Sequence, residues 1–65
     1  MVDIIQVGTN RYKIATDLTQ KGPFTTTLSI LNGEKEEGER NRKVSKTLKE
    51  AICAHQYMRE HADEI

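Results

Sequence analysis

Residues 45–65, SKTLKEAICAHQYMREHADEI, decide the fold expected of this chain. Helix-forming residues dominate this stretch, and neither Gly nor Pro interrupts it. Its apolar positions recur at the i, i+3, i+4, i+7 spacing of one helical stripe. The stripe consists of Leu48, Ala51, Ile52, His55, Met58, Ala62 and Ile65. The spacing predicts an amphipathic helix over about residues 47–63 that covers one face of a small β-sheet.

Both ends of this helix carry signals. Thr47 is followed three residues later by Glu50, the spacing of a capping box that satisfies free N–H groups of the first turn. At the other end Glu60, Asp63 and Glu64 lie where the helix dipole disfavours negative charge. We therefore expect a well-defined start and a frayed last turn.

Three segments before the helix have the composition and period of β-strands: residues 2–7, 12–18 and 24–31. The last two alternate, with Tyr12, Ile14, Thr16 and Leu18 on one face of the first and Phe24, Thr26, Leu28 and Ile30 on one face of the second. Turn-forming residues separate the segments at 8–11 and at 20–23, where Pro23 precedes a strand because proline lacks an N–H.

The segment between the third strand and the helix is harder to assign. Asn32-Gly33 indicates a turn, and the acidic residues that follow predict a solvated loop over 32–39 with nothing to pack. Residues 41–44 form either a short further strand or an irregular connection. The expected fold is α+β in one domain, residues 1–65: an antiparallel meander of three strands, or four, packed on one C-terminal helix.

Length and composition limit the class of protein. A chain of 65 residues buries only a thin core, so we expect a marginal monomer or a dimer that completes its core between chains, with the dimer favoured. The single cysteine, Cys53, excludes an internal disulfide and a cysteine metal cluster. We expect no membrane span and no secretory signal in the sequence, which predicts a cytoplasmic protein.

The sequence offers little catalytic chemistry. The glycine patterns of phosphate-binding loops are absent, and Cys53 has no evident base. His55 lies in the middle of the apolar stripe with no carboxylate beside it on the helix, so we interpret it as a core or interface histidine hydrogen-bonded to the sheet. We expect no enzyme, no cofactor, no metal ion and no small-molecule substrate.

The side of the helix opposite the stripe is unusual. Cys53 and Tyr57 lie one turn apart there, among charged residues, and exposed tyrosine is enriched at protein interfaces. Isolated exposed apolar groups are also ordinary on monomers. Together with Glu50 and His61, these two residues are the candidates for contact with another protein or with a second copy. The first hypothesis is therefore a small protein-interaction module, of the kind that serves as an accessory or inhibitor protein of phages or bacteria.

A nucleic-acid accessory module is the alternative hypothesis. The net charge is zero, yet residues 40–49 contain five cations and no acid, and such a run could contact phosphates. It could equally balance the neighbouring acids and protect an edge strand. The candidate residues are Lys13, Thr25 and Thr27 on the sheet with Arg40, Arg42, Lys43 and Lys46 from the run.

The basic segment that leads into Ser-Lys-Thr-Leu-Lys-Glu-Ala at residues 45–51 resembles the strand-to-helix junction of small domains with a three-stranded sheet and one helix. Among these are the arm-binding domains of phage-type integrases and the plant AP2-type domains, which place their sheet on DNA. The resemblance covers about residues 11–60 and implies a DNA-binding sheet face. This chain departs from them in its acidic segment, its zero net charge and its lack of an Arg- and Trp-rich face.

Overall fold

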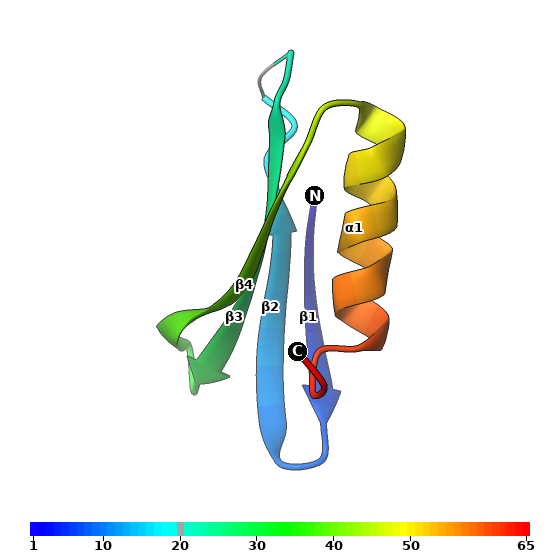
Figure 1. Cartoon of the computed structure of the whole chain (residues 1–65). Helices are drawn as coiled ribbons and strands as arrows, with labels where there is room; N and C mark the ends of the chain where they lie inside the picture. Colours follow the sequence, from blue (N-terminus) through cyan, green and yellow to red (C-terminus); the bar gives the residue numbers. More distant parts are fainter. Residues whose placement is uncertain (20) are drawn as a thin grey trace.

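Four antiparallel strands form one open sheet in the order β1-β2-β3-β4, and a single helix, α1, lies across one face of it (Figure 1). The computed structural model describes residues 1–19 and 21–65. The strands are β1 (Val2–Val7), β2 (Asn10–Thr16), β3 (Phe24–Asn32) and β4 (Lys35–Ser45), and α1 spans Leu48–Glu60. The α+β fold expected from the sequence is confirmed, with a fourth strand present.

Two tight turns build the outer hairpins. Val7 pairs with Asn10 across Gly8-Thr9, and Asn32 pairs with Lys35 across Gly33-Glu34. Gly8 and Gly33 have φ angles of 61° and 67°, in the left-handed region that side chains disfavour. Glycine at the first central position is the pattern of a two-residue type II′ turn, whose twist matches that of the flanking strands.

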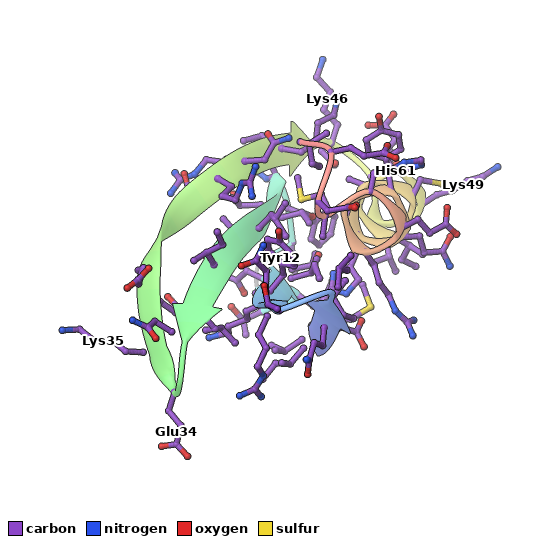
Figure 2. The ribbon with its side chains drawn as sticks, turned by 90° about the horizontal axis from the view of Figure 1, so that it is seen from below. Tyr12, Glu34, Lys35, Lys46, Lys49 and His61 are labelled. Atoms are coloured by element: carbon purple, nitrogen blue, oxygen red, sulfur yellow. The ribbon has the colours of Figure 1, made fainter. Side chains whose placement is uncertain are left out.

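The core lies between the sheet and α1, as Figure 2 shows end-on, with Tyr12 inside the fold and the Glu34-Lys35 turn projecting away from the helix. Cross-strand pairing places Tyr12, Ile14 and Leu28 on the helix-facing side, and all three are buried. Met58 and Ala62 of the helix region close over them. Strand alternation therefore explains why Tyr12, Ile14 and Leu28 face the core while Lys13 and Thr27 face away from it.

Thr47 is the N-cap of α1, as the sequence indicates. Its hydroxyl accepts a hydrogen bond from the Glu50 N–H at 3.2 Å. The Glu50 carboxylate accepts from the Lys46 N–H at 3.3 Å, one residue earlier than the usual capping box. The helix ends at Glu60, so the predicted extension to residue 63 is wrong. The acids at this end give the helix dipole no support, and residues 61–64 form turns instead.

The predicted acidic loop over residues 32–39 is also wrong, because β4 begins at Lys35 and runs through the acidic residues. Pairing with β3 provides hydrogen-bond partners for the backbone N–H and C=O groups of these residues. The segment can therefore form a strand although it has no apolar side chains to pack. Side-chain contacts offset their mutual repulsion: Glu36 bonds to Lys13, and Glu39 bonds to Arg42. The short strand proposed for residues 41–44 is the end of this longer strand.

Two smaller expectations also differ from the structure, and a third agrees with it in the residues described. The second strand spans Asn10–Thr16 rather than 12–18, and Leu18 lies beyond it with an exposed side chain. Leu48 and Ile52 belong to the predicted apolar stripe of the helix but are exposed. The sheet covers only part of that stripe. Of the break predicted at 20–23, residue 20 lies outside the described residues, and residues 21–23 connect β2 to β3.

Candidate functional site

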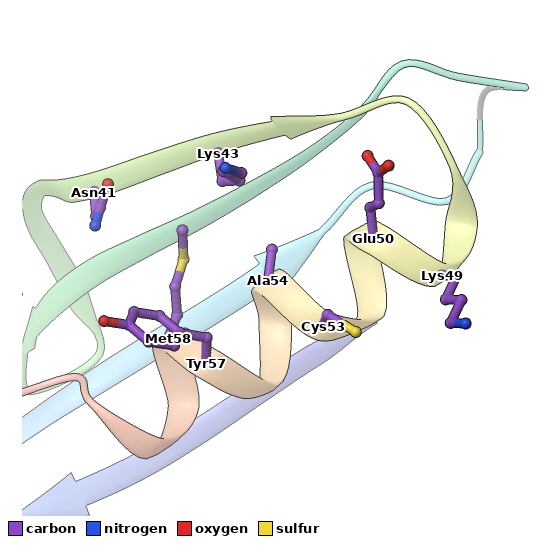
Figure 3. A pocket seen from close by; sticks show the side chains of 8 residues that line it. All are labelled: Asn41, Lys43, Lys49, Glu50, Cys53, Ala54, Tyr57 and Met58. Carbon is purple, nitrogen blue, oxygen red and sulfur yellow. The ribbon is translucent and has the colours of Figure 1, made fainter.

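A groove of about 570 Å³ separates β4 from α1 (Figure 3). A helix about 10 Å across covers about two strands spaced 4.8 Å apart, so one helix leaves part of a four-stranded sheet uncovered. The uncovered strip lies beside β4, whose helix-facing residues here are polar. Its walls are formed by Asn41 and Lys43 on β4 and by Lys49, Glu50, Cys53, Ala54, Tyr57 and Met58 on α1.

The helical wall is apolar in its middle and charged at one end. In Figure 3 Glu50 and Ala54 point towards the sheet, whereas Lys49 and Cys53 project away from it. Cys53 is an exposed free thiol at the outer edge of the groove. Tyr57 stands beside Met58 and leaves 55% of its surface exposed. The groove therefore offers an aromatic ring to a ligand, whereas Met58 is 3% exposed and belongs to the core.

His61 extends this surface past the end of the helix. Its ring stacks against Tyr57, with centroids 4.5 Å apart at a tilt of 35°. Its Nδ1 lies 2.8 Å from a Glu64 carboxylate oxygen, which orients the ring. Of the four predicted interface residues, Glu50, Cys53 and Tyr57 line the groove, and His61 contacts one of them. The structure gathers all four along one side of α1, while their role as an interface stays a prediction.

The nucleic-acid candidates do not form one patch, because successive strand residues face opposite sides of a sheet. The register places four of them on the face opposite α1, which we call the open face: Lys13, Thr25, Thr27 and Arg42. Lys43 lines the groove on the other side, and Lys46 lies in the connection to α1. Arg40 is the residue skipped at an irregularity in the β3–β4 register, between Glu39 and Asn41, and its guanidinium lies over the Tyr12 ring at 5.8 Å from the centroid.

Two cations of the open face, Lys13 and Arg42, have acidic partners, and Arg11 lies on the same face. Lys13 donates to Glu36 at 2.7 Å, and Arg42 donates twice to Glu39 at 2.8 and 3.1 Å. The hydrogen bonds that Arg42 donates to Glu39 raise the pKa of Arg42. All four side chains are well exposed, so these pairs add little stability, but they neutralise charge that would otherwise attract phosphate.

Sequence reasoning missed a chain of hydrogen bonds around His55. Its Nε2 lies 2.6 Å from a carboxylate oxygen of Asp3 on β1, and its Nδ1 lies 2.8 Å from the Thr16 hydroxyl on β2. The Thr16 hydroxyl also bonds to the Thr26 hydroxyl on β3 at 2.9 Å. The carboxylate comes from a strand 52 residues away, so a search along the helix could not find it. The available signal was that Asp3 occurs in phase with Ile5 and Val7, which face the core.

These hydrogen-bonded residues resemble a catalytic carboxylate–imidazole–hydroxyl array only in the order of their groups. A carboxylate only accepts, so Nε2–H donates to Asp3. When His55 is neutral, its Nδ1 accepts a hydrogen bond from the Thr16 hydroxyl. When His55 is protonated, its Nδ1 donates to that hydroxyl, and the hydrogen bond between the Thr16 and Thr26 hydroxyls changes direction. Thr16 is 2% exposed, and neither the groove nor the crevice between β1 and α1 includes it. The arrangement therefore joins α1 to three strands, which fits the expected role of His55 as a core histidine bonded to the sheet.

The contact between His55 and Asp3 also changes the acidity of Asp3. The hydrogen bond from His55 lowers the pKa of Asp3 below its ordinary 3.8. Partial burial opposes this shift, while the nearby charge of Arg59 adds to it. The ionised form of Asp3 is therefore the one that the folded chain stabilises.

Further comparisons add no functional assignment. Within residues 1–19 and 21–65, no three His, Cys, Asp or Glu side chains are grouped so that they could hold a metal ion. In the same residues, no helix has both the length and the apolar character needed to cross a membrane. When the chain is compared with known proteins, no family model, no curated protein and no solved structure matches it.

Proposed function

We propose that this chain is a small non-enzymatic protein-interaction module that holds a segment of another protein in the groove between α1 and β4. The observation that carries the proposal is Tyr57, which stands largely exposed over an apolar floor instead of being buried. Aromatic residues in such positions contribute much of the binding energy at protein interfaces. We place this activity in the cytoplasm, where Cys53 stays a thiol.

The groove favours a peptide segment of mixed character as its occupant. Ala54 and the edge of the largely buried Met58 form a narrow apolar strip. Lys43 and Lys49 flank this strip together with Glu50. A partner would therefore supply an apolar side chain for the strip and polar groups, acids above all, for the edges.

Cys53 provides the test, because it is the only thiol and lies at the edge of the groove. A photoactivatable cross-linker attached to Cys53 should capture a small set of proteins from an extract of the source cells. Tyr57→Ala in the labelled protein should reduce that capture at least severalfold, because the ring is removed while the buried core is left intact. Capture is measured by mass spectrometry with an isotope-labelled reference.

The matched control moves the label away from the groove. Cys53→Ser combined with Thr9→Cys places the thiol on the β1–β2 turn, and it should not capture the same proteins. If both label positions capture the same set, or if Tyr57→Ala leaves the yield unchanged, the groove is not the binding site. Circular dichroism of each variant checks that the fold is retained.

The nucleic-acid alternative is favoured by one observation: Lys13, Thr25, Thr27 and Arg42 share the open face of the sheet. Because Glu36 and Glu39 neutralise Lys13 and Arg42, we rank this function second. Its test is fluorescence anisotropy with duplex DNA at low salt, where phosphate contacts are strongest. Glu36→Gln with Glu39→Gln should strengthen binding if this face contacts phosphate. Absence of binding by both proteins would exclude it.

A further inference from the structure

β1 is an edge strand with free backbone groups. The N–H and C=O groups of Met1 exchange hydrogen bonds with Thr16 at 3.0 and 2.8 Å, so Met1 faces β2. Bonded residues alternate along an antiparallel ladder, so the odd-numbered residues of β1 bond to β2. The N–H and C=O groups of Val2, Ile4 and Gln6 therefore point away from the sheet. In the part of the chain that the structure describes, nothing pairs with them.

Apart from the inward-pointing charge of Asp3, this edge lacks the features that keep edge strands apart. Natural sheets protect their edges with lysine, proline, bulges or inward-pointing charge. The sequence VDIIQV contains no lysine and no proline, and its register with β2 is unbroken. Its one charge, Asp3, is bonded to His55 on the helix side. On the open face Val2 and Ile4 are 57% and 54% exposed.

The flank of α1 beside this edge also carries exposed apolar residues. Leu48 and Ile52 are exposed on the flank of α1 that faces away from the groove. Ile5 and Arg59 line the crevice between β1 and that flank. Leu48 and Ile52 are the members of the helical stripe that the core of one chain leaves uncovered.

We propose that a second copy of this chain binds here, with the two β1 strands antiparallel and Ile4 opposite the partner's Ile4. In this register Val2 lies opposite the partner's Gln6, and Gln6 opposite the partner's Val2. The three outward-facing residues then exchange about six hydrogen bonds, two for each pair. The two-fold axis runs normal to the sheet, so both helices lie on the same side of a continuous eight-stranded sheet.

Symmetry and charge select this partner and this register. Opposite residues must face the same side of the sheet, so the positions of each pair must both be odd or both be even. Centring on Asp3 would place two like charges opposite each other, and centring on Ile5 would bond two pairs instead of three. Centring on Ile4 sets each Asp3 against an Ile5 and closes the interface symmetrically. This dimer leaves the α1–β4 groove free and is independent of the function proposed for it.

The first test is the mass in solution, by sedimentation equilibrium over a range of concentrations. The wild-type protein should approach twice the 7.4 kDa of one chain. Ile4→Lys should shift it to the mass of one chain, because the two lysines would lie opposite each other. Val44→Lys is the matched control: Val44 is 56% exposed on the same face but on the other edge strand, and this variant should stay dimeric. A wild-type monomer at high micromolar concentration, or equal masses for the two variants, would overturn the proposal.

The second test measures the register and works even if a lysine variant unfolds. Opposite bonded residues have Cα atoms about 5.5 Å apart, within disulfide range. Ile4→Cys with Cys53→Ser should therefore form a disulfide-linked dimer under mild oxidation. Gln6→Cys with Cys53→Ser should not, because its counterpart lies four residues along the strand, about 13 Å away. Equal cross-linking of both variants would refute this register, and cross-linking of neither would refute the pairing.

Discussion

The two edges of this sheet differ in the features that govern strand pairing. β4 carries seven charged residues in its eleven, and its register with β3 shifts twice. β1 carries one charged residue in its six, and its register is regular. Charge and bulges are the means by which natural sheets keep an edge strand from pairing with another chain. The comparison shows one guarded edge and one unguarded edge in the same small sheet.

The edges also differ in how they contact the helix. β1 is joined to α1 by the bond from His55 to Asp3, deep beside the core. β4 meets α1 across the groove, where Lys43 and Asn41 face Tyr57 and its neighbours. A groove lies beside the guarded edge, while one short hydrogen bond and a crevice lie between α1 and the other edge, and the two proposals assign these surfaces to different partners. The following predictions test this division, from the largest expected effect to the smallest.

His55→Ala should reduce the free energy of unfolding by about 3 kcal/mol, because it leaves a cavity and a buried Thr16 hydroxyl with one partner fewer. It should also loosen β1 from the helix. Urea denaturation measures the loss. His61→Ala is the matched control and should cost less than about 0.5 kcal/mol, since His61 contacts only exposed groups. Equal losses for the two variants would mean that the contact with Asp3 does not hold β1.

Asp3→Asn should change how stability depends on pH. The folded-state pKa of Asp3 lies below 3.8, so its ionised form contributes stability that is complete above 3.8 and disappears as pH falls through the lower, folded value. The urea midpoint of the wild-type protein should therefore fall more steeply below 3.8 than that of Asp3→Asn.

Two other acidic residues serve as references for that measurement. Asp17, whose pKa is lowered by hydrogen bonds from Thr19, should leave part of the acid transition in the Asp3→Asn variant. Glu34→Gln, on the far turn, should reproduce the wild-type profile. If Asp3→Asn and the wild-type protein show the same pH dependence, the bond from His55 does not stabilise the ionised carboxylate.

Glu39→Gln should have the smallest effect, about 0.5 kcal/mol or less, because the pair with Arg42 is exposed on both sides. Measuring urea unfolding at low and high salt separates its charge contribution. A loss above about 1 kcal/mol would mean that the charges of β4 stabilise the strand as well as guard its edge.

Local sequence patterns were enough to predict several elements of the fold. The spacing of Ala51, His55 and Met58 predicted the buried side of the helix, and Thr47 predicted its start. Alternation in β2 and β3 predicted which residues face the core. These predictions succeed because the period of a helix or strand follows from backbone geometry, which neighbouring residues reveal. The candidates Glu50, Cys53 and Tyr57 came from the same periodicity, since it placed them on one side of one helix.

Tertiary structure alone decided the rest. The acidic residues after Gly33 belong to β4 because β3 offers them hydrogen bonds, and no local pattern records a partner strand. The basic run is divided because pairing fixes which side of the sheet each cation faces. His55 meets Asp3 only when the first strand and the last helix come together. In each case the deciding interaction joins two different elements, from the adjacent strands β3 and β4 to Asp3 and His55, which are 52 residues apart, so its free energy depends on the assembled fold.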